Sequence, residues 1–370
     1  MISGRCGLRR PVGLALVLLA STAGGWVAAE AHTGRQPLDI RVFARVPSPG
    51  QPEPVAIGPH RTVFVGTNQQ GKGDADAPSK VFVYSHRGRL RRGFELDGQD
   101  LESDHGIQGL AFDGRWRLYA LDRSADPRVV KIDLASGAQR TYARFRDVPS
   151  CMASGRDRNC SATVGDAAAG PDYAAFAPDG RLYVSDIDQA LIWRVPGGGG
   201  RPRVWFTDPR LENVFGPNGI QFMADGRTLL FAVTAQGPSA GDPTEGALFK
   251  LRVRRDGTAG RLRRFWTSRP LDGPDGFAIS RSGRVYLALA GANQLVVISP
   301  HGEEMARVPA TPIENQAMDV PMDGPASAAF LGRRLLVTNQ TSPAAGSGDP
   351  DHWAIFDVYA GERGLPLFRP

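Results

Sequence analysis

Residues 171–187 read PDYAAFAPDGRLYVSDI: a short apolar strand, an Asp-Gly turn at 179–180, and a second strand rich in Leu, Tyr and Val. This order predicts a β-hairpin, because Asp-Gly favours a tight turn between strands. Clear copies occur at 217–233 (PNGIQFMADGRTLLFAV) and 274–290 (PDGFAISRSGRVYLALA), and weaker copies at 52–67, 107–123 and 325–340. The hairpin therefore recurs six times, which predicts a repeat architecture.

Further strand-like stretches follow most of these hairpins, at 80–85, 128–134, 191–195, 247–253 and 294–299. A period of about 50 residues that contains four strands is typical of a propeller blade. Helical periodicity is absent, and 45 glycines and 29 prolines suit a chain rich in turns. We therefore predict an all-β, six-bladed β-propeller with four-stranded antiparallel blades around a central channel.

The repeats indicate one propeller domain over residues 38–360, with 361–370 as a C-terminal tail. The segment 38–46 precedes the first hairpin and is expected to supply the outer strand of the last blade, whose third strand is 353–359. That overlap would close the ring. A seven-bladed ring is the alternative, with a hidden hairpin around 140–169.

The first 31 residues have the pattern of a signal peptide. Three arginines precede an apolar run at 12–20, and AEA at 29–31 offers a small-x-small cleavage site. A membrane anchor is the alternative, but polar residues and glycines at 21–25 interrupt the run well short of about 18 residues. We expect an exported protein, periplasmic or secreted, without membrane insertion after cleavage. Arg9-Arg10 leaves both the general and the twin-arginine export routes open.

Charge and cysteine content limit the partners of the mature chain. Removing residues 1–31 changes the formal net charge from +6 to +4. The arginines are scattered through turns and strand edges, so we expect no nucleic-acid partner, and we expect a monomer. Cys151 and Cys160 remain, nine positions apart in a polar loop. In an oxidising compartment a disulfide is expected, with metal ligation by these cysteines as the alternative.

A polar position recurs four residues before the Phe or Ile near the end of each first strand. In chain order it is occupied by Glu53, Gln108, Asp172, Asn218, Asp275 and Ala326. First strands of propeller blades line the channel, so equivalent positions form one ring at one mouth. Each residue alone is also typical of a turn, but turn chemistry does not require the same offset in successive blades.

Carboxylates crowded in such a ring would raise each other's pKa unless a cation neutralised them. Oxygen ligation by Glu53, Asp172, Asn218 and Asp275 suits Ca²⁺ best, with Mg²⁺, Mn²⁺ or Zn²⁺ as alternatives. His105 and Gln108 lie in the same repeat and are candidates for the shell around these ligands.

These motifs resemble the SMP-30/gluconolactonase/LRE-like family of six-bladed propellers over nearly the whole mature chain. The resemblance is carried by Glu53 in PEP, Asp172 in PDY, Asn218 in GPNGIQF and Asp275 in GPDGFAI. It implies one divalent metal at these residues and the hydrolysis of a lactone. Two positions depart from the family pattern: Pro54 replaces the usual Gly, and Asp172 stands where many members have Asn.

The expected function is metal-dependent opening of a small lactone. The cation would polarise the ring carbonyl, and Asp275 or Asp172 would take a proton from the attacking water. The alternative is a non-catalytic propeller whose metal is structural and whose rim binds a small ligand or a protein. A third candidate, a carbon-carbon bond-forming enzyme resembling strictosidine synthase, would need no metal.

Overall fold

The computed structural model describes residues 34–69, 77–151, 160–161, 167–211, 215–235, 245–342 and 346–368. The expected signal peptide, 1–31, lies outside the described residues. Residues 36–370 form one compact unit. Among the described helices, none combines the length and the apolar character that a membrane crossing requires.

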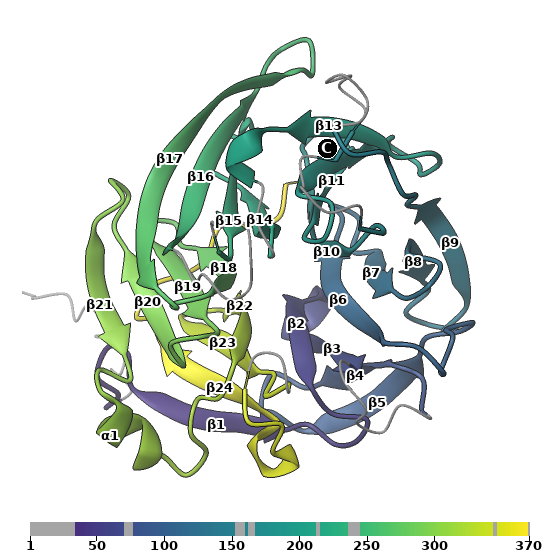
Figure 1. Cartoon of the computed structure of the whole chain (residues 1–370). Helices are drawn as coiled ribbons and strands as arrows, with labels where there is room; N and C mark the ends of the chain where they lie inside the picture. Colours follow the sequence, from purple (N-terminus) through teal and green to yellow (C-terminus); the bar gives the residue numbers. More distant parts are fainter. Residues whose placement is uncertain are drawn as a thin grey trace, which may run out of the picture. The chain divides into compact units, whose positions relative to one another are not determined.

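Nearly all regular structure is antiparallel β-strand, arranged in five sheets (Figure 1). Four sheets have four strands each: β10(Pro171–Phe176)-β11(Leu182–Asp186)-β12(Leu191–Val195)-β13(Arg203–Thr207), β14(Pro217–Phe222)-β15(Thr228–Val233)-β16(Glu245–Val253)-β17(Ala259–Pro270), β18(Pro274–Ile279)-β19(Val285–Leu289)-β20(Gln294–Ile298)-β21(Glu304–Val308) and β22(Pro325–Leu331)-β23(Arg334–Asn339)-β24(Ala354–Tyr359)-β1(Ile40–Arg45).

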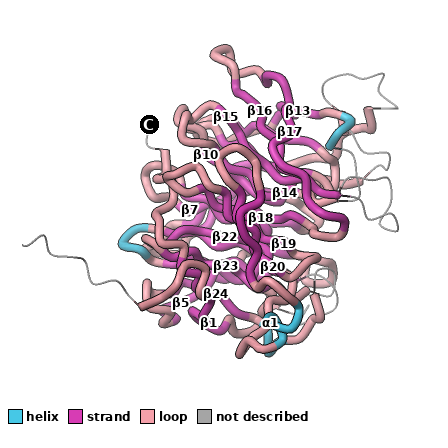
Figure 2. Tube along the Cα trace, turned by 90° about the vertical axis from the view of Figure 1, so that its left-hand side faces the viewer, coloured by secondary structure: helices cyan, strands magenta, loops and turns pink. Residues whose placement is uncertain are grey.

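The fifth sheet has eight strands and contains two units of the same order, joined where β3 pairs with β6. These units are β2(Pro52–Ile57)-β3(Val63–Gln69)-β4(Lys80–Tyr84)-β5(Leu90–Glu95) and β6(His105–Phe112)-β7(Leu118–Arg123)-β8(Arg128–Ile132)-β9(Gln139–Arg144). Helix α1 (Pro312–Gln316) lies at the periphery (Figure 2). The other helical turns among the described residues are the short 3₁₀ segments η1 (Pro59–Arg61), η2 (Pro209–Leu211) and η3 (Pro350–His352).

The first strand of every unit lies innermost, which makes the arrangement propeller-like (Figure 1). Each inner strand contacts the next one in the order β2, β6, β10, β14, β18, β22, and β22 contacts β2. The outer strand β1 pairs with β24, so strands from near the beginning and near the end of the compact region 36–370 share one sheet, as the sequence predicted. Between β9 and β10 the described residues add no further hairpin, and they give no support to a seventh unit.

Every first strand has an irregularity at the polar position. The pairing register shifts between Pro52 and Val55, Ile107 and Gly109, Pro171 and Ala174, Pro217 and Ile220, Pro274 and Phe277, and Pro325 and Ala328. A bulge of this kind re-aims side chains and interrupts the strict alternation of a strand. The bulge recurs at the equivalent position of all six first strands, so that residue and its successor need not point to opposite faces of the strand.

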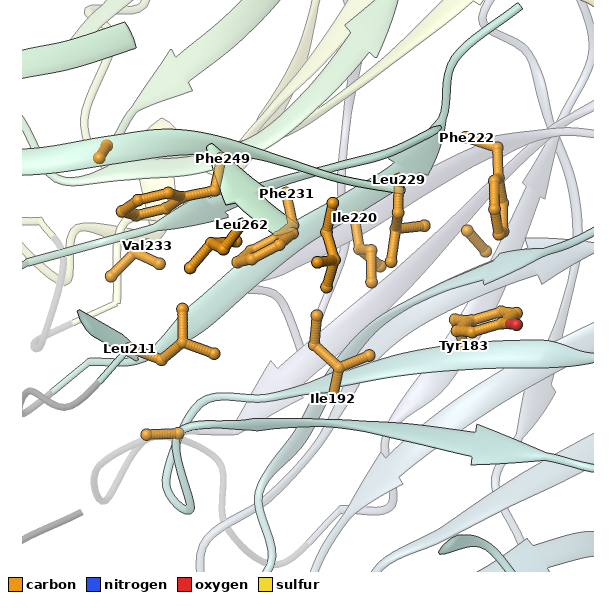
Figure 3. Packing of buried hydrophobic residues seen from close by; sticks show 14 of the residues in the cluster. Tyr183, Ile192, Leu211, Ile220, Phe222, Leu229, Phe231, Val233, Phe249 and Leu262 are labelled. Carbon is orange, nitrogen blue, oxygen red and sulfur yellow. The ribbon is translucent and has the colours of Figure 1, made fainter. Parts of the chain in front are cut away.

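Apolar side chains from facing sheets fill the space between them, as Figure 3 shows for the sheets β10–β13 and β14–β17. The Tyr183 ring meets Phe222 edge-on with centroids 5.3 Å apart, and Phe231 stacks on Phe249 at 5.9 Å. Each such buried side chain contributes about 1.5 to 3 kcal/mol to folding. This packing fixes the middle strands and thereby holds the inner strands in place.

The segment after residue 360, which the sequence predicted to be a C-terminal tail, packs against the inner strands. The backbone N–H of Leu365 donates to the carbonyl of Ile279 at 2.9 Å, and Glu362 accepts from the Tyr286 hydroxyl at 2.8 Å. Phe368 packs on Phe222. The tail has no strand periodicity, so its sequence gave no sign of this role.

Ending the chain at Gly361 is expected to lower the free energy of unfolding by about 2 kcal/mol, because it exposes the apolar surface under Leu365 and Phe368. Urea denaturation would measure the change. The full chain with Leu367→Ala is the control, since Leu367 is 40% exposed and its loss should have little effect. An unchanged midpoint in the shortened chain would show that the tail does not stabilise the fold.

Candidate metal centre

Five buried polar side chains stand at equivalent positions of the first strands, and we call them the polar ring. Their exposed fractions run from 3% to 7%. They are Glu53 on β2, Gln108 on β6, Asp172 on β10, Asn218 on β14 and Asp275 on β18; the equivalent position on β22 is Ala326.

Each member of the polar ring has one buried polar atom without a hydrogen-bond partner. These atoms are Glu53 Oε2, Gln108 Nε2, Asp172 Oδ2, Asn218 Oδ1 and Asp275 Oδ1. An unsatisfied buried polar atom costs about 1 to 3 kcal/mol, and native proteins contain few of them. Five at one level of one channel therefore indicate a place that binds something polar or charged.

Burial raises the pKa of all three carboxyl groups of the polar ring, and neighbouring negative charges add to the rise for two of them. Burial raises the pKa of Glu53 well above its usual range, and the charges of Asp275 and Asp172 raise it further. Burial and the charge of Asp275 act in the same way on the pKa of Asp172. Burial raises the pKa of Asp275 to about 8, although the backbone N–H of Gly276 and the side chains of Tyr173 and Asn218 oppose the rise. The charge of Asp275 thus acts on both other carboxylates of the polar ring.

Tyr173 is a site residue that sequence reasoning missed. Its hydroxyl lies 3.2 Å from the carbonyl oxygen of Ala326 and 3.4 Å from Glu53 Oε1, so it can donate to either. Strict strand alternation would point neighbours 172 and 173 to opposite faces, and only the bulge lets both approach the ring. Alignment of the six repeats could have pointed to Tyr173, because one copy alone has a Tyr directly after the polar position.

Arg123, at the end of β7, is a second residue that the sequence did not single out. Its Nη2 donates to Asp188 Oδ2 at 2.8 Å, and the pair is partly buried. Although burial dominates the pKa of Asp172, the positive charge of Arg123 lowers it. Arg123 therefore provides a positive charge near the polar ring.

His105 stands at the start of β6 and is buried, but its ring nitrogens face two backbone carbonyls. Nδ1 lies 2.7 Å from the Ser103 oxygen and Nε2 lies 3.1 Å from the Ala77 oxygen. These contacts connect β6 to the segment before β4. The other candidate for the outer shell, Gln108, is a member of the polar ring itself.

Cys151 and Cys160 form a disulfide, so a pairing expected from their spacing is present. Residues 152–159 lie outside the described part of the chain. The nearby backbone is ordered by Ser161, whose N–H donates to the Pro149 oxygen and whose hydroxyl donates to the Gln189 oxygen.

The string GPSAG at 237–241 matches the Gly-x-Ser-x-Gly pattern of serine hydrolases, which sequence reasoning overlooked. That motif works at a turn between a strand and a helix. Here the flanking elements are β15 and β16, neighbouring strands of one antiparallel sheet, and the string itself lies outside the described residues. The context therefore gives the match little weight.

The donor set of the polar ring fits a hard divalent cation. Within the described residues, no three Asp, Glu, His or Cys side chains form a ready-made metal cluster. The amide oxygen of Asn218 is also an expected ligand. Together with Glu53 and Asp275, it gives a ligand set of one amide and two carboxylates. Carboxylate and amide oxygens are the ligands that Ca²⁺ prefers. The unpaired oxygens of all three side chains are available for such an ion.

The fold and the polar ring define an all-β, propeller-like protein with a candidate cation site among its inner strands. Residues 174–339 match the SMP-30/Gluconolactonase/LRE-like region, which confirms the family resemblance for this part of the chain. This match includes Asn218 and Asp275, whereas Glu53 and Asp172 lie before it. Among curated proteins, no sequence matches the chain significantly.

Solved structures of three proteins illustrate the fold. A calcium-binding regucalcin from Agrobacterium tumefaciens is 19% identical, with a TM-score of 0.58 over 90% of this chain and 98% of that one. A gluconolactonase from Xanthomonas campestris is 17% identical, with a TM-score of 0.54 over 87% and 96%. A PQQ-bound aldose sugar dehydrogenase from Streptomyces coelicolor is 16% identical, with a TM-score of 0.59 over 87% and 98%. These three proteins have different functions, although each is about equally similar to this chain. The likenesses therefore establish the fold alone.

Proposed function

We propose that the protein is a six-bladed propeller that opens lactones with the help of one divalent cation, most simply Ca²⁺. In this proposal the two halves of the eight-stranded sheet count as separate blades. Glu53, Asn218 and Asp275 hold the cation, and Asp172 lies beside it. The resemblance to gluconolactonases and to a calcium-binding regucalcin supports this choice of reaction and ion.

The observation that carries the proposal is the polar ring itself. Burial raises the pKa of all three carboxylates, the charge of Asp275 raises the pKa of Glu53 and Asp172 further, and each carboxylate keeps an unpaired oxygen. Arg123, whose charge opposes this rise, is already paired with Asp188. Burying such charges without compensation is costly, and a bound divalent ion would compensate them.

The ring residues have separable roles in the proposed reaction. A bound cation would supply Lewis acidity toward the lactone carbonyl. Asp172 Oδ2 and Asp275 Oδ1 have no hydrogen-bond partner, so either carboxylate can accept the proton of the attacking water once it is ionised. The Asn218 amide is oriented by its own bond to Thr234, where Nδ2 donates to Oγ1 at 3.0 Å and leaves the amide oxygen free.

The direct test is hydrolysis of a small lactone panel before and after chelation, followed with a pH indicator. We expect activity that disappears on chelation and returns with one of Ca²⁺, Mg²⁺, Mn²⁺ or Zn²⁺. Activity that survives complete removal of metal would contradict the proposal. Stoichiometric metal binding without turnover of any lactone would instead indicate a non-catalytic binding propeller.

A further inference from the structure

We propose that the Tyr173 side chain crosses the central channel next to the polar ring and limits how far a ligand bound at the ring can extend along the channel. We call this side chain the Tyr173 bar. The residue that follows the polar position differs sharply among the first strands. In chain order it is Pro54, Gly109, Tyr173, Gly219, Gly276 and Ser327. Five of these residues are small, whereas Tyr173 has a side chain long enough to reach across the channel.

Tyr173 reaches the opposite side of the ring of inner strands. It belongs to β10, and its hydroxyl lies 3.2 Å from the oxygen of Ala326 on β22. Since the inner strands contact one another in the order β10, β14, β18, β22, these two strands are three steps apart in a closed ring of six. A Cβ added to Gly276, on the strand between, would lie 2.6 Å from the Tyr173 hydroxyl. The absence of a side chain at Gly276 therefore makes room for the tyrosine hydroxyl.

A separate chamber lies further along the inner strands. Its volume is about 310 Å³, and the C-terminal tail from Leu365 to Phe368 forms part of its wall. The other walls are mainly apolar and include Val55, Leu110, Ala174, Ile220, Ile279 and Ala328. These residues stand two or more positions beyond the polar ring, and Tyr173 stands one position beyond it. The tyrosine is thus placed between the polar ring and the chamber.

The partition has a consequence for substrates, which rests on the proposed function. A lactone whose carbonyl is at the polar ring cannot extend an alkyl substituent past Tyr173 into the chamber. The enzyme should therefore prefer lactones with short substituents. Shortening residue 173 should join the two compartments and admit longer chains, because each methylene that leaves water for an apolar wall adds roughly fourfold in affinity.

The test uses a probe that needs neither metal nor catalysis. In the metal-free protein, n-alkylammonium ions from methyl to octyl can pair their cationic head with the carboxylates of the polar ring, and calorimetry measures their affinity. We expect nearly constant affinity along the series in the wild type and in Tyr173→Phe, which keeps the aromatic ring. In Tyr173→Ala we expect octyl to bind at least about tenfold more tightly than methyl.

Three outcomes would overturn the bar: equal chain-length dependence in all three proteins, a wild type that already favours octyl as strongly as Tyr173→Ala does, or no binding of any amine. Tyr173→Leu replaces Tyr173→Ala if the latter fails to fold. Hydrolysis of γ-lactones with increasing alkyl chains forms the second arm, with relative kcat/KM expected to shift toward long chains in Tyr173→Ala. A shift in amine binding without lactone hydrolysis would refute the proposed function and leave the bar intact.

Discussion

Asp275→Asn is expected to lower kcat/KM for a lactone by about a hundredfold to a thousandfold. The substitution keeps the shape of the side chain but removes a charge from the group that would both hold the cation and stand beside the reacting carbonyl. Loss of a ligand should also weaken metal binding by about a hundredfold or more, since even substitution of a residue that only hydrogen-bonds to a ligand can lower metal affinity by up to about a hundredfold. Steady-state kinetics and calorimetric titration with Ca²⁺ would measure the two effects.

Asp179→Asn is the matched control for this experiment. Asp179 occupies the Asp-Gly turn of the same kind of hairpin, with a side chain that is 49% exposed and paired with Arg181. Its substitution should leave both kcat/KM and metal affinity unchanged. Full hydrolytic activity in Asp275→Asn, with metal still bound, would remove Asp275 from the proposed mechanism.

Glu53→Gln is expected to stabilise the metal-free protein while abolishing its stabilisation by metal. Without a cation, the ionised Glu53 is buried near Asp172 and Asp275, and a neutral glutamine relieves the repulsion, by about 1 to 2 kcal/mol. With metal at 100 times its Kd, the wild type should gain about 2.7 kcal/mol and the variant almost nothing. Chemical denaturation with chelator and with Ca²⁺ gives all four values.

The pH dependence of this difference follows from the raised pKa of Glu53. A carboxyl whose pKa is higher in the folded state than in the unfolded state opposes folding when it is ionised, and the penalty vanishes as the pH falls below both values. The metal-free variant should therefore exceed the wild type by more at about pH 9 than at about pH 5. A variant that is less stable than the metal-free wild type at both pH values would show that the carboxylates of the ring do not repel one another.

Much of the fold could be predicted because the hairpin repeats in the sequence. The six copies gave the inner and second strands, and the extra segment before Pro52 gave the strand that pairs with β24. The packed tail could not be predicted, since Leu365, Leu367 and Phe368 follow no strand or helix period. Its place depends on the backbone groups of Ile279 and Arg281, which only the folded sheet presents.

The polar ring was visible in the sequence because its members share one offset from a strand residue. Tyr173 and Arg123 were not, for two different physical reasons. Tyr173 approaches the ring through a bulge, and a bulge cannot be read from a single strand. Arg123 lies near Asp172 only because the second strand of one unit ends beside the first strand of the next, a relation that the linear pattern does not contain.

A crystal structure of the wild-type protein grown with Ca²⁺ tests the central claim most directly. We predict one ion on the channel axis, with oxygens of Glu53, Asn218 and Asp275 at calcium distances of about 2.3 to 2.6 Å. An ion bound elsewhere, or a polar ring that holds only water in the presence of saturating Ca²⁺, would contradict the account.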